Sequence, residues 1–221
     1  MTDVTVIIVA AGSGRRFGQP KQFSILKGKT VLDWSLDRFS RHERVSNIAL
    51  VLPQGARVQE IIDRYPKIVA VAEGGKTRQQ SVAAGFRCLS LKPRDVVLVH
   101  DAARPLVSVE LIDRVISGVI ENGAAVPLIP IEDTVKEIED NRILRTVERS
   151  KLYLAQTPQG FLFGILQRAI RETENNQWQG TDEASLVELM QYRVIGVPGE
   201  KSNIKITSPV DLKIAEGLLE N

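Results

Sequence analysis

The chain has 221 residues, 43% of them hydrophobic and 25% charged, and its formal net charge is +2. These are ordinary values for a globular domain, and so small a charge gives no argument for nucleic acid or an anionic membrane as a partner. One cysteine, Cys88, and two histidines exclude an intramolecular disulfide and a zinc site built from several such residues. Because Cys88 falls in the apolar stretch 86–91, we expect a buried structural thiol.

The N-terminal residues do not begin the charged and apolar pattern of a signal peptide. No apolar run approaches the roughly 20 residues that a membrane-spanning helix needs. We therefore expect a soluble, cytoplasmic protein that binds neither membrane nor nucleic acid.

Short apolar runs alternate with amphipathic stretches over the first 130 residues. The runs predict strands at 4–10, 48–52, 68–72, 96–99 and 124–129. The amphipathic stretches predict helices at 31–40, 58–65, 78–89 and 109–122. This alternation is typical of an α/β fold, with a Rossmann-like, mostly parallel sheet flanked by helices. Three polar segments, 12–21, 74–78 and 100–104, follow strands, so we expect them to meet at the carboxyl edge of the sheet, where such folds bind ligands.

The pattern changes after Pro130. Two short alternating runs, 134–139 and 143–148, surround Asp140-Asn141, a plausible tight turn, and predict a β-hairpin arm at about 131–150. Because an isolated hairpin is marginal in water, we expect it to pack on something, such as a second subunit. Helices at 164–174 and 181–190, strands at 194–197 and 204–206, and a helix from Ser208 complete a single domain, 1–221.

The first polar segment is a glycine-rich loop, 10–21, that leaves the end of a buried strand. Its small residues let consecutive backbone N–H groups approach phosphate oxygens, and Arg15, Arg16 and Lys21 add three cations. The dinucleotide fingerprint fails because Phe17 stands where its third glycine belongs, and a Walker A motif fails because Phe23 stands where its first glycine belongs. The sequence of this loop predicts a binding site for a nucleoside triphosphate.

With this loop, the sequence resembles the sugar-phosphate nucleotidyltransferases and, more narrowly, the 2-C-methyl-D-erythritol 4-phosphate cytidylyltransferase family. The resemblance runs from about Val4 to the C-terminus. It rests on six motifs in order: 10–21, 74–82 (Gly-Gly-x-x-Arg-x-x-Ser-Val), 99–105 (Val-His-Asp-Ala-Ala-Arg-Pro), 157–159, 181–185 and 203–207.

The resemblance implies a transfer of the cytidylyl group from CTP to the methylerythritol 4-phosphate acceptor, with release of pyrophosphate and help from Mg²⁺. It implies that the catalytic residues are Arg16, Lys21 and Lys205. It implies that the nucleotide is bound by Ala10, Ala11, Gly12, Ser13, Gly14, Gly74, Gly75, Ser81 and Ala102. It implies that the acceptor is bound by Asp101, Arg104, Thr134, Arg149, Thr181 and Lys205, with Thr134 and Arg149 on an arm that completes the neighbouring site of a homodimer.

Several of these residues also have plainer interpretations. Asp101 suits Mg²⁺, but it is equally typical of a helix cap or of a salt bridge with Arg104. Thr181 could simply cap the helix that follows. An inward-facing Lys205 between two isoleucines indicates an anion partner. His100 is interpreted as structural, because an ionised phosphate nucleophile needs no general base.

Other functions remain open from the sequence. The nearest is a cytidylyltransferase for ribitol 5-phosphate, which shares the loop. A non-catalytic nucleotide-binding protein is a second, although the intact Arg16, Lys21 and Asp101 argue against it. An NAD-dependent oxidoreductase is disfavoured by the displaced glycine.

Overall fold

The computed structural model describes residues 3–14, 17–56 and 58–220. Its main sheet has eight strands in the order β10-β7-β11-β6-β1-β4-β5, and β12 lies beside β7. The strands are β1 (Val4–Val9), β4 (Asn47–Leu52), β5 (Ile68–Glu73), β6 (Val96–Asp101), β7 (Ala124–Pro130), β10 (Tyr153–Ala155), β11 (Gln159–Leu162) and β12 (Ile195–Pro198). The helices are α1 (Val31–Arg41), α2 (Gln59–Arg64), α3 (Arg78–Arg87), α4 (Val109–Asn122), α5 (Phe163–Asn176), α6 (Glu183–Leu189) and α7 (Pro209–Leu218).

The mostly parallel sheet is confirmed. β1 pairs in parallel with β4 and β6, β4 with β5, and β12 with β7. The exceptions are β10 and β11, which the sequence did not predict. β11 is inserted between β6 and β7 and runs antiparallel to both. It is only four residues long and passes directly into α5, so its apolar residues are hard to separate from those of the helix.

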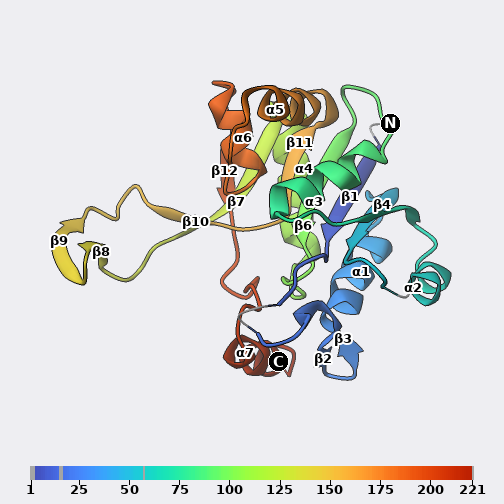
Figure 1. Cartoon of the computed structure of the whole chain (residues 1–221), viewed down its shortest axis with the longest axis horizontal. Helices are drawn as coiled ribbons and strands as arrows, with labels where there is room; N and C mark the ends of the chain where they lie inside the picture. The colour runs from blue at the N-terminus through green and yellow to red at the C-terminus, as the bar shows by residue number, and fades with distance from the viewer. Residues whose placement is uncertain (1–2, 15–16, 57, 221) are drawn as a thin grey trace.

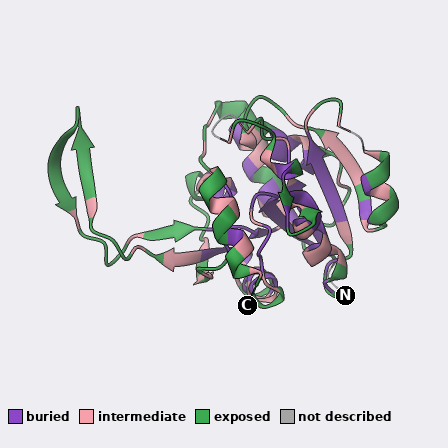
Figure 2. Cartoon of the chain, turned by 90° about the horizontal axis from the view of Figure 1, so that it is seen from below, coloured by how far each residue is buried: buried purple, intermediate pink, exposed green. Residues whose placement is uncertain are grey.

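Helices cover both faces of the sheet (Figure 1). On one face α1, α2 and α4 pack against side chains such as Val6 and Ile8. On the other face α3, α5 and α6 pack against side chains such as Ile7 and Val97. Consecutive residues of β1 thus enter opposite cores, which explains why all of this strand except Thr5 is apolar. Figure 2 shows the buried centre of the sheet between its more exposed helices.

A smaller unit lies beyond the carboxyl edge of the sheet. It comprises a short 3₁₀ helix, η1 (Lys21–Phe23), the hairpin β2 (Ile25–Leu26) and β3 (Lys29–Thr30), and helix α7. The apolar cluster that joins them contains Leu26, Val31, Leu106, Ile206 and Ala215. Lys27 and Gly28 turn the hairpin with φ angles of 47° and 80°.

Two local expectations are wrong. The expected strand at 204–206 is irregular chain, although Ile206 is buried and its N–H donates to the Ala103 carbonyl at 2.8 Å. Cys88 is exposed rather than buried. It caps the C-terminal end of α3, so the apolar run 86–91 spans the end of a helix and only part of it faces the core.

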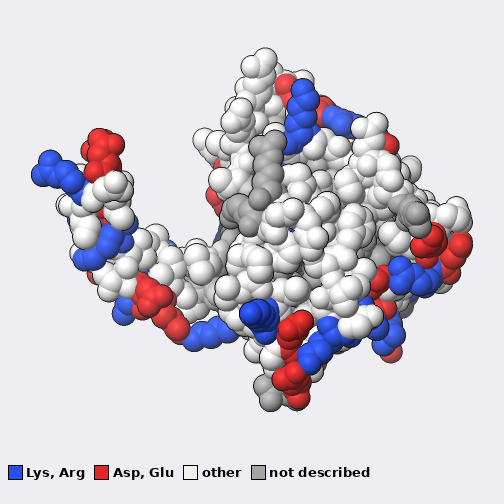
Figure 3. Space-filling view, turned by 60° about the horizontal axis from the view of Figure 1, so that its bottom comes forward, with Lys and Arg blue, Asp and Glu red and all other residues white. Residues whose placement is uncertain are grey.

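The predicted hairpin arm consists of β8 (Val135–Glu139) and β9 (Arg142–Val147), which pair only with each other among the described strands. Asp140 and Asn141 form its turn, with φ angles of 46° and 64°. The arm projects from the body, and Lys, Arg, Asp and Glu side chains are mixed along it (Figures 1 and 3). Apolar side chains are nevertheless exposed on it, with Ile138 at 60% and Ile143 at 63%.

No helix of the described residues is long and apolar enough to cross a membrane.

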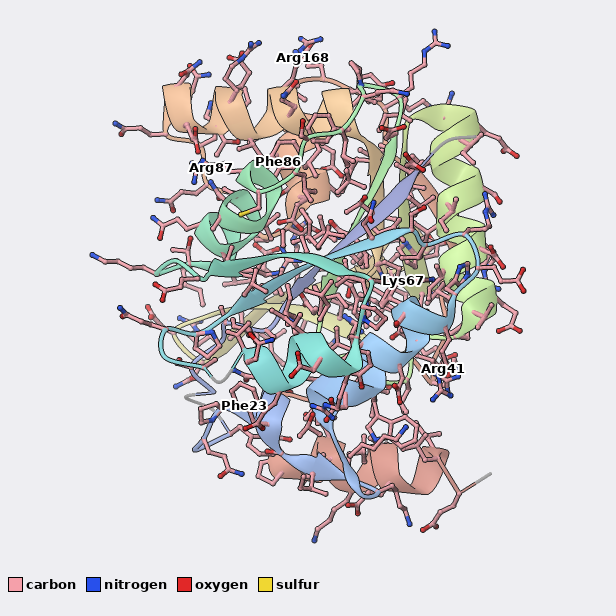
Figure 4. All side chains as sticks on the ribbon, turned by 90° about the vertical axis from the view of Figure 1, so that its right-hand side faces the viewer. Phe23, Arg41, Lys67, Phe86, Arg87 and Arg168 are labelled. Carbon is pink, nitrogen blue, oxygen red and sulfur yellow. The ribbon has the colours of Figure 1, made fainter. Side chains whose placement is uncertain are left out.

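The packing of α5 gives a direct test of the two-sided core. Leu166 is fully buried against the sheet, whereas Arg168 extends from the same helix into solvent (Figure 4). Leu166→Ala should lower the free energy of unfolding by about 2–5 kcal/mol, because it removes buried apolar surface and leaves a cavity. The matched variant Arg168→Ala should change it by less than about 0.5 kcal/mol. Urea unfolding of both variants measures the difference, and equal effects would contradict the assigned packing.

Candidate active site

A cavity of about 460 Å³ lies at the carboxyl edge of the sheet, beside the ends of β1 and β6. It gathers three segments that are distant in the sequence, as predicted: the glycine-rich loop, the turn before α3 and the end of β6. The predicted site residues that line it are Ala10, Ala11, Gly12, Ser13, Lys21, Gly75, Ser81, Asp101, Ala102 and Lys205. Gly14, Gly74, Arg104, Thr134, Arg149 and Thr181 are not among its lining residues. Arg16 lies outside the described residues.

The glycine-rich loop depends on Gly14. Its φ of +66° is one that other residues rarely adopt, and a Cβ there would lie 1.7 Å from the Gln19 carbonyl oxygen. The Gly14 carbonyl accepts hydrogen bonds from the N–H groups of Phe17 and Gly18 at 2.8 and 2.9 Å. This turn returns the chain to η1, whose first residue is Lys21. The Lys21 ammonium donates to the Ile206 carbonyl at 2.6 Å, which places it at the cavity edge.

The Gly74–Gly75 pair allows two close approaches of the chain. A Cβ on Gly74 would lie 2.1 Å from the Ala11 Cβ, and one on Gly75 would lie 2.4 Å from the Gln80 Cβ. The Ser81 hydroxyl accepts from the Gly75 N–H at 3.1 Å and donates to the Thr77 carbonyl at 2.9 Å. Ser81 therefore holds this turn in place, and its contact with a nucleotide stays a prediction.

Asp101, the last residue of β6, sits between two cations. Its Oδ1 accepts from the Arg78 Nε at 2.8 Å, and its Oδ2 accepts from the Lys205 ammonium at 2.6 Å. Burial by itself would raise the pKa of this carboxyl, but Arg78 and Lys205 together hold the pKa well below its usual range. The inward-facing Lys205 thus has the anion partner that its position indicated.

The alternative salt bridge between Asp101 and Arg104 is not formed. The Arg104 guanidinium instead donates to the backbone carbonyls of Asn203 at 2.7 Å and Ala155 at 3.4 Å. Burial lowers the pKa of Arg104. Because these hydrogen bonds go to carbonyls and not to a carboxylate, Arg104 is suited to an anionic ligand.

His100 lies in the core, where it is fully buried against Phe39 with 4.7 Å between the ring centroids. Its Nε2 lies 3.1 Å from the Arg104 carbonyl, and its Nδ1 lies 3.3 Å from the Thr157 hydroxyl. Burial lowers the pKa of His100 to about 3, so the ring is neutral near pH 7. This environment agrees with the structural interpretation.

The sequence reasoning missed an ion pair beneath the cavity. The Arg78 Nη1 donates to both carboxylate oxygens of Glu183, at 2.9 and 2.8 Å, while its Nε holds Asp101. Both residues fall in the motifs 74–82 and 181–185, but their pairing was not predicted. A signal was nevertheless present, because an acid in the first turn on the buried side of a helix needs a cation.

Thr181 is exposed, and it does not cap α6. Asp182 is the N-cap, and its side chain accepts from the Ser185 N–H at 2.9 Å. Both residue types are favoured at that position, so the sequence could not separate them. The interpretation of Thr181 as a plain cap is wrong, and its contact with the acceptor stays a prediction.

Thr134 and Arg149 lie at the base of the arm. Thr134 is exposed, and the Arg149 guanidinium donates to the Glu132 carbonyl. The arm extends away from the body of its own subunit (Figure 1), so neither residue belongs to the cavity of its own chain.

Comparison with known proteins identifies the family to which this site belongs. The profile of 2-C-methyl-D-erythritol 4-phosphate cytidylyltransferase matches residues 4–221. The chain belongs to this family. A relative with this name from Alkaliphilus metalliredigens is 41% identical over 98% of this chain and 92% of its own length. A second, from Syntrophus aciditrophicus, is 39% identical over 98% of this chain and 96% of its own length.

A solved structure of a member agrees with the fold. The crystal structure of 2-C-methyl-D-erythritol 4-phosphate cytidylyltransferase from Thermus thermophilus is 36% identical, with a TM-score of 0.84. The match covers 97% of this chain and 98% of that one. The resemblance on six short motifs is thus confirmed over nearly the whole chain.

The geometry of Gly14 predicts which glycine the site depends on. Gly14→Ala should weaken binding of CTP, the nucleotide expected from the sequence, by at least about tenfold, or about 1.4 kcal/mol, because the new Cβ collides with the Gln19 carbonyl. Gly18→Ala is the matched control, since Gly18 also has a positive φ, of +84°, but a Cβ there meets nothing within 4 Å. Calorimetric titration with CTP measures both affinities, and equal losses in the two variants would contradict the role of the turn.

Proposed function

We propose that this protein joins CTP and 2-C-methyl-D-erythritol 4-phosphate to give 4-diphosphocytidyl-2-C-methyl-D-erythritol and pyrophosphate. Residues 1–221 act as one nucleotidyltransferase domain with a protruding arm. The family assignment supports the reaction. The observation that carries it is the convergence of the glycine-rich loop, Lys21, Asp101 and Lys205 on one cavity at the carboxyl edge of the sheet.

The triphosphate lies along the loop from Ala10 to Lys21, and the cytosine lies toward Gly74–Ser81. A 4-phosphate oxygen of the acceptor attacks the α-phosphorus in line. The new P–O bond forms as the bond from the α-phosphorus to the bridging oxygen breaks, and pyrophosphate leaves with that electron pair. The attacking phosphate is already ionised near pH 7, so no protein base is needed. The neutral, buried His100 is consistent with this scheme.

Catalysis then consists of positioning and charge stabilisation. The cations Arg16, Lys21 and Lys205 neutralise the charge that grows on the α- and β-phosphates. Lys21 and Lys205 approach the cavity from opposite ends of the sequence, from η1 and from the irregular segment after β12.

The donor set at Asp101 fits a divalent cation that is shared with the nucleotide. The described residues hold no group of three or more His, Cys, Asp or Glu that could bind a metal on their own. Mg²⁺, however, commonly uses one or two carboxylates together with substrate phosphates and water. Each Asp101 oxygen accepts one hydrogen bond in the cluster with Arg78 and Lys205, which leaves lone pairs for a metal. Asp101 would hold Mg²⁺, which supplies charge neutralisation at the phosphates.

The acceptor is held by Asp101, Arg104, Thr181 and Lys205, together with Thr134 and Arg149 from the arm of a second subunit. Two features of the arm support a homodimer. It pairs with no other described strand of its own chain, and it exposes Ile138 and Ile143, whose burial a second copy would provide.

The substrate assignment is tested by pyrophosphate release from CTP with three acceptors: methylerythritol 4-phosphate, ribitol 5-phosphate and glucose 1-phosphate. The first should support turnover, and the others should be at least about 100-fold poorer in kcat/KM, because a site built around a polar substrate group rejects analogues that leave its buried partners unpaired. Preference for ribitol 5-phosphate would replace the assignment with that of the sibling enzyme. Absence of turnover with all three would indicate a non-catalytic nucleotide-binding protein.

Lys21→Ala tests the proposed role of the loop cation. Loss of one preorganised charge should lower kcat by about 10²–10³-fold. Lys213→Ala is a matched control, because Lys213 is exposed on α7 and does not line the cavity. Steady-state kinetics measure kcat for both variants. A near-normal kcat for Lys21→Ala would show that Lys21 has no catalytic role.

The shared site is tested by complementation. Lys21→Ala removes a residue of the cavity, whereas Arg149→Ala removes a residue of the arm. Each homodimer should be nearly inactive, but a heterodimer should regain one working site, built from the intact cavity of one chain and the intact arm of the other. Activity is measured after subunits are mixed, and labelled subunits report the exchange. Demonstrated exchange without recovered activity would argue against a shared site.

A further inference from the structure

We propose that Arg78 is a positioning residue, anchored on Glu183, that holds the Asp101 carboxylate in place while Lys205 exchanges between Asp101 and substrate phosphate. The inference rests on the proposed function and assigns separate tasks to the two cations beside Asp101.

The guanidinium of Arg78 bridges two carboxylates from different elements. Its Nε donates to Asp101 at the end of β6, and its Nη1 donates to Glu183 in the first turn of α6. Arg78 itself is the first residue of α3, directly after the turn that lines the cavity. One side chain therefore connects three elements at the floor of the site. A planar guanidinium can do this because its donors point in fixed, separate directions, whereas an ammonium is a single point charge.

The burial of Glu183 makes its ion pair with Arg78 costly to break. Glu183 is 1% exposed, and the described residues offer its carboxylate hydrogen bonds and ion pairs only from Arg78. If Arg78 moved toward a ligand, it would leave a buried carboxylate uncompensated, which is strongly unfavourable. Arg78 therefore stays with Glu183 and keeps its Nε on Asp101.

Lys205 is placed differently. Its side chain is 35% exposed, against 25% for Arg78, and its ammonium donates to Asp101. Movement of this ammonium to a phosphate oxygen exchanges one anion for another and leaves Asp101 still paired with Arg78. In the proposed reaction this exchange frees Oδ2 of Asp101 while Oδ1 remains held.

The ion pair between Arg78 and Glu183 also fixes the position of the start of α6. Gln159 on β11 donates to the Asp182 carboxylate at 2.7 Å and accepts from the Ala184 N–H at 3.1 Å. Together with the Arg78–Glu183 pair, these bonds tie residues 182–184 to the sheet. Thr181, the expected acceptor contact, immediately precedes this tied segment.

The test compares three variants. Arg78→Lys keeps the positive charge but loses the planar guanidinium whose donors reach both carboxylates. Glu183→Gln keeps the side-chain shape but removes the negative charge that pairs with Arg78. Arg87→Lys is the matched control, because Arg87 lies on the same helix and its ion pair with Glu174 is exposed, at 60% and 51%. The readouts are kcat and KM for the acceptor, calorimetric CTP affinity in EDTA, and the thermal unfolding midpoint.

Both Arg78→Lys and Glu183→Gln should lower kcat/KM for the acceptor by about 10- to 100-fold, the usual cost of losing a partner that orients a ligand-binding group. For Glu183→Gln, CTP affinity in EDTA should change by less than about twofold, or about 0.4 kcal/mol, because Glu183 does not line the cavity. Arg87→Lys should leave every readout near the wild-type value.

A purely structural role would lower the unfolding midpoint and the active fraction but leave the acceptor KM and kcat of the remaining folded sites unchanged. That result in both variants overturns the proposal. If Arg78→Lys does not fold, Glu183→Gln decides alone, since it removes a buried charge without changing the side-chain volume. Failure of the proposed function is distinguishable, because the wild-type protein would then release no pyrophosphate from CTP and methylerythritol 4-phosphate.

Discussion

The site depends on a carboxylate that is buried at the carboxyl edge of the sheet. Asp101 is 7% exposed, and such a charge persists in a protein interior only if cations accompany it. Arg78 and Lys205 meet that requirement from segments 23 and 104 residues away. Because Arg78 is in turn fixed by Glu183, this single requirement draws α3, α6 and the chain after β12 to the same cavity as the glycine-rich loop.

The chain after β12 is irregular, but hydrogen bonds from the rest of the fold keep it ordered. It forms neither helix nor strand at 203–207, yet it carries Lys205 and provides the carbonyl that accepts from Lys21. Two buried amides hold it. Gln156 bonds both the N–H and the carbonyl of Glu200, and Asn203 donates to the Thr157 carbonyl at 2.9 Å. Hydrogen bonds from these buried amides to the backbone order a segment that has no ladder of its own.

Much of this arrangement is predictable from the sequence, and the limits are physical. Buried parallel strands such as β1 and β4 are almost entirely apolar, and their ends fix where the polar segments meet, so the cavity was predicted together with most of its lining. The Arg78–Glu183 pair spans 105 residues, so a buried acid in the first turn of α6 indicates that a cation is needed, but only the folded chain shows that Arg78 provides it. Cys88 and Thr181 were misjudged because a helix end moved by one or two residues changes which side chain is buried or caps.

We propose that CTP binds in this cavity with its triphosphate on the glycine-rich loop. A crystal structure with CTP and Mg²⁺ would reveal this placement. We expect it to show phosphates along residues 10–21, the Lys205 ammonium on a phosphate oxygen, and Arg78 still paired with Glu183 and Asp101. A nucleotide bound elsewhere, or one bound here with Arg78 turned from Glu183 to the phosphates, would contradict it.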